Sequence, residues 1–167
     1  MAPISLRLAV AADAEQIRTI YNHEVVHTAA TFDLVPRSLA DQQAWLAARS
    51  GAFAAIVAVD SAGGDVVGFG ALSPYKERAA YRTSVEDSVY VRRDRNGEGI
   101  GSLLVQELLS VAASSGFHAV FARINASGEA SIALHRKWGF ELLGVEREVG
   151  RKFNRWHDVA LMEHLLI

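Results

Sequence analysis

The feature that most constrains this chain is a run of three glycines at alternate positions, Gly97, Gly99 and Gly101. After them, apolar residues recur at helical spacing from Ile100 until Gly116, whereas the preceding TSVEDSVYV has the character of a strand. The pattern predicts a strand, a tight turn and a helix. Unpaired backbone N–H groups and the helix dipole converge at such a turn and favour an anion such as a phosphate.

The turn differs from two well-known phosphate-binding motifs. No Gly-Lys-Ser/Thr sequence follows, as a P-loop requires, and the spacing and mid-chain position do not suit a dinucleotide-binding fingerprint. A pyrophosphate still suits the turn, because glycines leave the backbone open and Arg92, Arg93 and Arg95 can add charged contacts. The alternative is a glycine-rich turn that only begins a helix.

Strands are expected in seven segments, which alternate or form short β-rich apolar runs. They are 6–10, FAAIVAVDS, VVGFGALSPY after a turn at 62–65, TSVEDSVYV, HAVFARI, FELLGVEREVG and WHDVALMEHLL.

Helices are expected in four segments, with start and stop signals at their ends. They begin after Asp13, paired with Gln16, and after Ser38, paired with Asp41 and running to about Ser50; the third is the helix after the glycines, and the fourth is ASIALHRKW, ended by Gly139. The segment 28–37 is a loop or short helical turn. The expected order is β-α-α-β-β-β-α-β-α-β-β, a mixed α/β arrangement in one domain over residues 1–167.

Composition excludes several classes. The 167 residues contain no cysteine, which rules out disulfides, thiolate metal sites and cysteine nucleophiles. Seventeen basic residues against 19 acidic ones give a net charge of −2, so nucleic acid is not an expected partner. The N-terminus lacks an export signal and no long apolar run occurs, so we expect a soluble, cytoplasmic protein without membrane contact.

A competing motif is His23-Glu24-Val25-Val26-His27, which satisfies H-E-x-x-H on a predicted helix, as in zinc peptidases. The longer metzincin motif fails, because Ala30 stands where a glycine is required. Zinc proteolysis is therefore the least favoured alternative, and we expect no metal site.

The strand ending in EDSVYV, the R-x-G-x-G-x-G turn and the later ASIALHRKWGF together resemble the acetyl-CoA-binding core of the GNAT superfamily of N-acetyltransferases. YNHEV, TFD, YKERAAYRTSVEDSVYV and RWHDVALM are similar to the phosphinothricin acetyltransferase family, whose members acetylate the α-amino group of phosphinothricin, methionine sulfone or methionine sulfoximine. The resemblance implies a GNAT fold with a mixed, mostly antiparallel sheet flanked by helices. It also implies acetyl-CoA as co-substrate, a small amine acceptor and a homodimer.

The resemblance implies that Glu86 is the general base for the acceptor amine. Strand alternation places it on one face with Ser88 and Tyr90, and Asp87 on the other. The alternative is a surface carboxylate paired with an arginine. His135 occupies a helix position where many GNAT enzymes carry a tyrosine acid, and imidazole can donate or relay a proton near neutral pH. It could equally be an exposed polar residue of a short helix.

The cofactor is expected to contact the strand backbone, the glycine turn and two residues further on: Val89, Tyr90, Val91, Arg95, Asn96, Gly97, Glu98, Gly99, Ile100, Gly101, Ser102, Asn125 and Ser131. Asn96 and Gly128 depart from the family, which usually has Gln or Arg and Asn there.

The acceptor is expected at Phe32, Lys76, Arg78 and Tyr81, because the guanidinium fork of Arg78 matches a carboxylate or phosphinate. A solvated charge cluster is the alternative at these positions. A non-catalytic acyl-CoA sensor that kept the same pocket is the alternative function.

Overall fold

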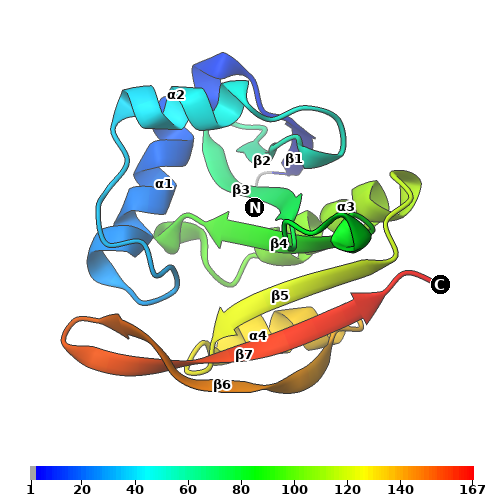
Figure 1. The fold of residues 1–167 in the computed structure, drawn as a ribbon. Helices are drawn as coiled ribbons and strands as arrows, with labels where there is room; N and C mark the ends of the chain where they lie inside the picture. The colour runs from blue at the N-terminus through cyan, green and yellow to red at the C-terminus, as the bar shows by residue number, and fades with distance from the viewer. Residues whose placement is uncertain (1–2) are drawn as a thin grey trace.

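The computed structural model describes residues 3–167, which form a seven-stranded sheet with helices on both faces (Figure 1). In chain order the elements are β1 (Ile4–Leu8), α1 (Ala14–His27), α2 (Leu39–Ala47), β2 (Ile56–Asp60), β3 (Val66–Pro74), β4 (Ser84–Val91), α3 (Ile100–Ser114), β5 (Ala119–Asn125), α4 (Glu129–Lys137), β6 (Glu141–Lys152) and β7 (Arg155–Leu165). This order confirms the predicted one. The strands lie in the order β1-β2-β3-β4-β5-β7-β6.

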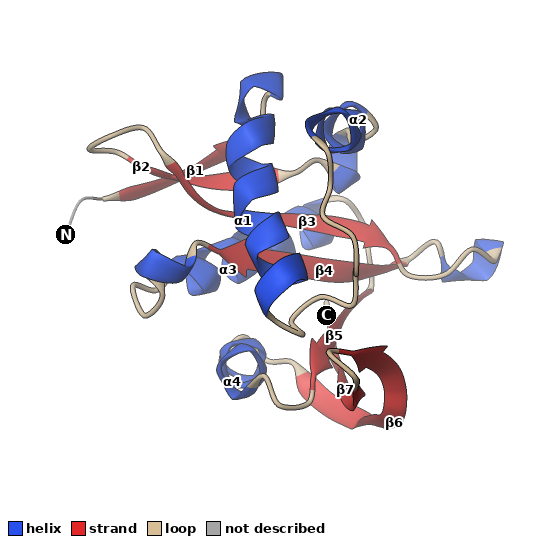
Figure 2. Cartoon of the chain, turned by 90° about the vertical axis from the view of Figure 1, so that its left-hand side faces the viewer, coloured by secondary structure: helices blue, strands red, loops and turns tan. Residues whose placement is uncertain are grey.

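Each face of the sheet carries an apolar core. Ile56 and Ala58 of β2 pack in the core formed with α3, whereas Val57 and Val59 pack in the core formed with α1. Figure 2 shows α1 in front of β3 and β4, with α3 behind them. Because β2 is buried on both faces, its sequence is a continuous apolar run rather than an alternating one.

The β4–β5 pair determines where a pocket can form. It is the one parallel pair among the described strands; Ser84 lies opposite Ala119 and Glu86 opposite Phe121, and no pairing of these strands continues beyond Glu86 within residues 3–167. On its other side β4 stays paired with β3 as far as Val91. The second half of β4 therefore keeps a partner on one side and diverges from β5 on the other.

Three helix-end predictions are confirmed and one is wrong. Ser38 caps α2 by accepting the N–H of Asp41 at 3.0 Å, and Gly116 and Gly139 have the left-handed φ of +83° expected after helices. Asp13, however, makes no side-chain cap with the residues described for α1. Its carboxylate accepts two hydrogen bonds from Arg7, so a charged partner from β1 replaces the predicted cap.

Gln16, the other half of that predicted cap, reaches out of the helix. Its side-chain oxygen accepts the backbone N–H of Val66 at 2.8 Å. Two predicted limits also shift, since the first strand is Ile4–Leu8 rather than 6–10 and α2 ends at Ala47 rather than near Ser50. No helix formed by residues 3–167 combines the length and apolar character needed to cross a membrane.

Candidate functional site

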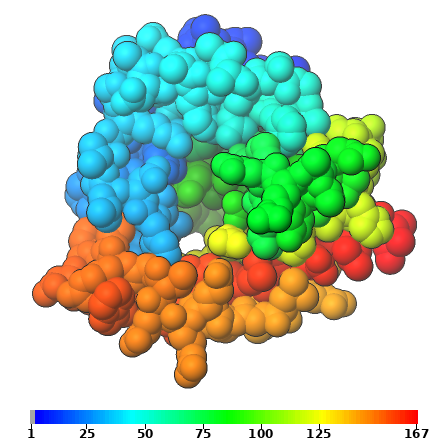
Figure 3. Space-filling view, viewed as in Figure 1, coloured from blue at the N-terminus to red at the C-terminus, as the bar shows by residue number. Residues whose placement is uncertain are grey.

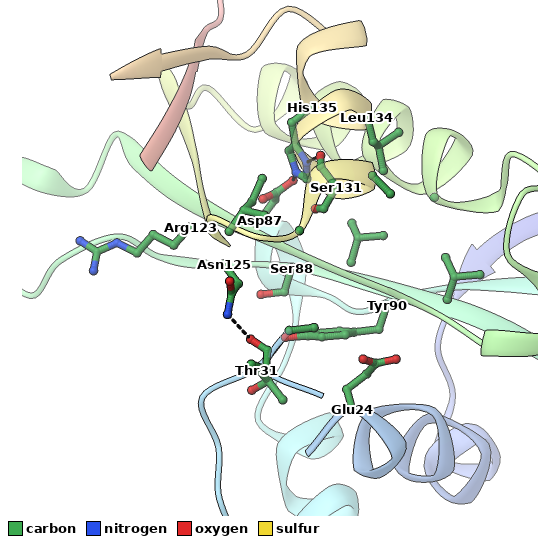
Figure 4. Close-up of a pocket in the computed structure, with 18 of the residues that line it drawn as sticks. Glu24, Thr31, Asp87, Ser88, Tyr90, Arg123, Asn125, Ser131, Leu134 and His135 are labelled. Atoms are coloured by element: carbon green, nitrogen blue, oxygen red, sulfur yellow. Dashed lines mark hydrogen bonds and ion pairs between the residues drawn. The ribbon is translucent and has the colours of Figure 1, made fainter. Parts of the chain in front are cut away.

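A pocket of about 850 Å³ lies where β4 and β5 diverge. Figure 3 shows the hollow between the light-blue early segment, green and yellow atoms of the middle of the chain and the orange segment of β6, and Figure 4 shows side chains that line it. Every predicted cofactor-binding residue lines it except Glu98, and so do Glu86, His135 and Phe32.

Beyond Glu86, β4 lines the pocket with backbone groups that are not paired with β5. Arg92 donates its N–H to Val67 of β3 at 2.9 Å. Because alternate residues of a strand turn their backbone groups to opposite neighbours, Val91 and Val89 direct theirs toward the side where β5 has left. An extended ligand with amide groups can complete this edge as an added strand would.

The glycine turn forms one end of the pocket, and its local structure follows from its residues. Gly97 and Gly99 have φ of +83° and +81°, which non-glycine residues adopt at a cost. No described atom lies within 4 Å of the positions that Cβ atoms would occupy there. The first N–H groups of α3 have no partners within the helix, so an anion can approach the open backbone.

Gly101 serves a different purpose from its two neighbours. A Cβ at this position would lie 3.1 Å from a methyl group of Leu134 in α4, so the glycine permits close packing of α3 against α4. Ser102, one residue on, accepts hydrogen bonds from Trp138 at 2.9 Å and Lys137 at 3.1 Å. The third glycine therefore allows α3 and α4 to pack closely at the pocket wall.

Arg95 lines the pocket, but its guanidinium is already engaged. It donates to Asp60 at 2.7 Å and to Glu98 at 2.6 Å, and its side chain is largely buried. The ion pair with Asp60 ties the turn to the end of β2, and the pair with Glu98 lies within the turn. Glu98 pairs with this arginine and lies outside the pocket lining, so its cofactor-binding role stays a prediction.

Glu86 lies on β4 where the pairing with β5 ends, and its side chain is 31% exposed. Burial raises the pKa of Glu86; the positive charge of Arg123 opposes the shift, and the carboxylates of Asp87 and Glu146 add to it. Arg123 is 3.6 Å from Glu86, longer than a hydrogen bond. The result is a pKa above the ordinary value, which suits a group that must accept a proton.

His135 is buried, so the alternative of an exposed helix residue is wrong. Its Nε2 lies 2.8 Å from the carboxylate of Asp87 and its Nδ1 lies 2.7 Å from the carbonyl oxygen of Ser131. Burial lowers the pKa of His135, but the charge and hydrogen bond of Asp87 and the Ser131 carbonyl outweigh it and raise the pKa overall. With an acceptor at each nitrogen, the protonated ring satisfies both contacts.

The loop 28–37 covers one side of the pocket and is held by three contacts. Asn125 of β5 donates to the carbonyl of Ala29 at 3.1 Å (Figure 4), and the buried ammonium of Lys152 donates to the carbonyl of Thr31 at 2.8 Å. A Cβ at Gly150 would overlap the ring of Phe32, so Phe32 packs directly on the backbone of β6. Phe32 thus lines the pocket as predicted.

Three predicted acceptor residues are not brought to the pocket. Lys76, Arg78 and Tyr81 are absent from its lining among the residues described. Lys76 instead lies over the rings of Tyr75 and Tyr81, at 5.0 and 5.1 Å. Tyr75 stacks on Phe121, and neither ring lines the pocket.

The H-E-x-x-H motif is present on α1, but its carboxylate is occupied. Glu24 is buried and accepts two hydrogen bonds from Arg93 and one from Thr28. The rings of His23 and His27 lie against each other, 4.8 Å apart. A carboxylate held by an arginine fork is poorly placed to activate a metal-bound water, so the geometry disfavours the peptidase alternative.

Sequence reasoning missed several residues that line the pocket. The main ones are Glu24, Thr31, Asp87, Ser88, Arg123 and Glu146. Two carried a usable signal. Arg123 is the one charged residue of HAVFARI, and a charge in an otherwise apolar strand needs a reason. Asp87 lies on the opposite face of the strand from Glu86, so a charged residue there also needs a partner, and that partner is His135.

Comparison with known proteins agrees with this geometry. Residues 6–161 match the family model of the acetyltransferase (GNAT) domain. The chain is 40% identical to an L-methionine sulfoximine/L-methionine sulfone acetyltransferase of Pseudomonas paraeruginosa, covering 95% of this chain and 92% of that one. It is 39% identical to a phosphinothricin N-acetyltransferase of Streptomyces coelicolor, covering 99% and 98%.

The fold comparison agrees as well. The structure of a GNAT superfamily phosphinothricin acetyltransferase of Sinorhizobium meliloti in complex with acetyl-CoA aligns with a TM-score of 0.93 at 38% identity, covering 98% of this chain and 88% of that one. The chain belongs to the GNAT family of acetyltransferases, as the sequence resemblance implied.

Acetyl-CoA is the co-substrate of this family, and the residues present fit it. The glycine turn leaves room for a diphosphate against the backbone, and the unpaired edge of β4 can receive the amides of a pantetheine arm. Asn96 and Gly128, the two departures from the family, both line the pocket.

Proposed function

We propose that this protein transfers the acetyl group of acetyl-CoA to the α-amino group of a small amino-acid-like acceptor such as methionine sulfone, methionine sulfoximine or phosphinothricin. The named relatives act on these compounds and match nearly the whole chain. The observation that carries the proposal is the position of Glu86, a half-buried carboxylate in the pocket that also contains the glycine turn.

The co-substrate supplies an activated acetyl group as a thioester. Glu86 takes one proton from the acceptor ammonium, and the freed nitrogen lone pair attacks the acetyl carbonyl carbon. As the C–N bond forms, the C–S bond breaks, and coenzyme A leaves as a thiolate that takes up the second proton lost by the nitrogen. The backbone N–H groups of Val89 and Val91 line this path and can donate to the carbonyl oxygen or the pantetheine arm. Arg95 and the turn from Asn96 to Ser102 form the diphosphate site, in which Arg95 fixes the turn.

His135 supports this site through Asp87 and Ser131. Both ring nitrogens are engaged, so a proton given to the departing thiolate would leave a neutral ring beside Asp87. The contacts favour a positioning role, in which the ion pair holds α4 against β4 and so keeps Ser131 at the pocket.

The proposed activity is tested by thiol release from acetyl-CoA in the presence of methionine sulfone, methionine sulfoximine or phosphinothricin. Glu86→Gln keeps the shape of the side chain but cannot take a proton, so kcat should fall by about 10²- to 10⁴-fold while the Kd of acetyl-CoA stays nearly unchanged. Full kcat in this variant would contradict the base assignment. Acetyl-CoA binding by the native protein without turnover of any acceptor would favour the sensor.

A homodimer is the predicted assembly, and one surface supports it. β6 is an edge strand of the sheet, and several apolar side chains of β6 and β7 are exposed: Leu142, Leu143, Val145, Val149 and Trp156. Exposed apolar patches at a sheet edge favour association. Light scattering of the native protein and of a Leu143→Glu variant measures the mass, and a monomer at all concentrations would exclude the dimer. The cytoplasmic location stays a prediction.

A further inference from the structure

The acceptor side of the pocket contains a charged group that the sequence analysis did not assign. Arg123 of β5 lies between two carboxylates, 3.6 Å from Glu86 and 3.8 Å from Glu146. All three side chains line the pocket. Figure 4 shows Arg123 extending away from Tyr90 and Thr31 toward the edge of the pocket.

Arg123 is positioned by the sheet and by aromatic neighbours. Glu86 lies opposite Phe121, and Arg123 follows Phe121 by two residues, so its side chain shares the face of the sheet that carries the Glu86 carboxylate. The ring of Tyr75 stacks on Phe121 at 4.1 Å and lies 5.9 Å from the guanidinium carbon of Arg123. An aromatic ring therefore lies beside the guanidinium, while 43% of the side chain stays exposed.

The guanidinium has donors available for a ligand. Its separations from Glu86 and Glu146 both exceed hydrogen-bond length, so neither carboxylate holds it in a bidentate pair. A guanidinium carries five N–H donors in a planar fork that matches a carboxylate. The two carboxylates and one guanidinium together carry one net negative charge, which leaves room for an additional positive charge.

An α-amino acid complements this arrangement. Its ammonium nitrogen and carboxylate carbon are two bonds, or about 2.5 Å, apart, so one molecule can place its ammonium on Glu86 and its carboxylate on Arg123. Lys76, Arg78 and Tyr81, which the sequence predicted for this task, lie outside the pocket lining. A simple amine or an amino acid amide lacks the second charge.

We propose that Arg123 binds the α-carboxylate of the acceptor and makes the enzyme selective for free α-amino acids over acceptors without that carboxylate. The inference rests on the proposed function, because it assigns the acceptor contacts of the same site. Arg123 is a specificity-determining residue that orients the amine toward Glu86.

The test compares kcat/KM for methionine sulfone with kcat/KM for its carboxamide, measured by thiol release. In Arg123→Met the ratio of acid to amide should fall by about 10- to 100-fold, chiefly through KM of the acid, because a charge-assisted contact is lost. Arg123→Lys should retain part of the ratio, since it keeps the charge without the fork. Arg147→Met is the matched control, because Arg147 is an exposed arginine of β6 that does not line the pocket.

An unchanged acid-to-amide ratio in Arg123→Met would overturn the inference, and so would an equal loss for both acceptors in a variant with unchanged KM for acetyl-CoA. If Arg123→Met does not fold, Arg123→Gln tests the same ratio, because it keeps a polar head without the charge. A native protein that acetylates neither compound would refute the proposed function itself, which separates the two failures.

Discussion

At Glu86, opposing influences set how strongly the carboxylate holds a proton. Burial raises its pKa, Arg123 opposes that shift, and Asp87 and Glu146 reinforce it, so the pKa stays above its ordinary value. Arg123 thus affects the base as well as the proposed acceptor carboxylate.

The dependence of activity on pH should report this balance. Because catalysis requires unprotonated Glu86, kcat/KM should fall as the pH decreases through the raised pKa of Glu86. Removing the nearby positive charge in Arg123→Met should move this acidic limb to higher pH. The carboxamide acceptor is used for both proteins, so that loss of carboxylate binding does not obscure the limb. Superimposable limbs would contradict the electrostatic role of Arg123.

Single residues show how far sequence reasoning reaches. Strand alternation correctly separated Glu86 from Asp87, because that depends on two adjacent positions. The neighbourhood of Arg123 depends on the register between β4 and β5 and on the fold of the 75–81 connection, which no local pattern encodes. The prediction of Arg78 at the acceptor likewise rests on its chemistry, without knowledge of where the connection folds. The prediction of Asp13 as a helix cap fails because Arg7, on β1, binds its carboxylate.

At the scale of elements, one buried ion pair joins α4 to β4. His135 and Asp87 are 48 residues apart in sequence and each side chain is about 5% exposed or less. A raised histidine pKa means that the folded state binds the proton more tightly than the unfolded state does. The stabilisation is therefore fully present below the unfolded pKa, near 6.5, and is lost as the pH rises through the raised value.

His135→Gln should test this contribution by urea denaturation at several pH values. Below pH 6 the free energy of unfolding should fall by about 3–5 kcal/mol, because the variant leaves the Asp87 charge buried without its partner. The difference from the native protein should narrow above the raised pKa of His135. His118→Gln, at an exposed position, should show neither effect. A constant difference across the range would refute the ion pair.

The contact of the loop 28–37 with β6 is a second feature at this scale. Gly150 has no room for a side chain, because Phe32 packs on its backbone. Gly150→Ala should therefore displace Phe32 and raise the KM of the acceptor several-fold, with little change in the KM of acetyl-CoA. Gly150→Ala should raise the KM of the acceptor by a smaller factor in the Phe32→Leu variant than in the native protein, because the ring that it displaces is then absent. Strict additivity of the two single effects would contradict the contact.

Helices and strands were predictable because their signals are local. The Ser38–Asp41 cap, the glycines after α3 and α4 and the element order all follow from neighbouring residues. The three anchors of the loop 28–37 come from β5 and β6, about a hundred residues away, and were beyond such reasoning. The prediction of one domain over residues 1–167 remains a prediction, supported by two cores that share β2.

For the whole molecule, cofactor binding should be visible as added stability. At 100 times its Kd, acetyl-CoA should contribute about 2.7 kcal/mol, or a rise of about 5–10 °C in Tm for a chain of this size. Gly99→Val should abolish most of this rise, because the side chain fills the open backbone cradle.

Gly51→Val is the matched control for that measurement. Gly51 also has a positive φ, of +58°, and open space at its Cβ position, but it lies before β2 and outside the pocket lining. It should lower Tm by strain while the rise with acetyl-CoA persists. An equal loss of the rise in both variants would show that strain, and not the diphosphate cradle, explains the effect at Gly99.

The short β4–β5 pairing also bears on how the molecule moves. The block from β1 to β4 and the block from β5 to β7 meet in the sheet through three paired residues of each strand. Amide protons of Val89 and Val91 have no ladder partner on that side and should exchange quickly with solvent in the free protein. A ligand arm bound between the diverging ends of β4 and β5 would slow their exchange and restrain the two blocks. The bound co-substrate would then connect the two halves of the sheet where no strand pairing does.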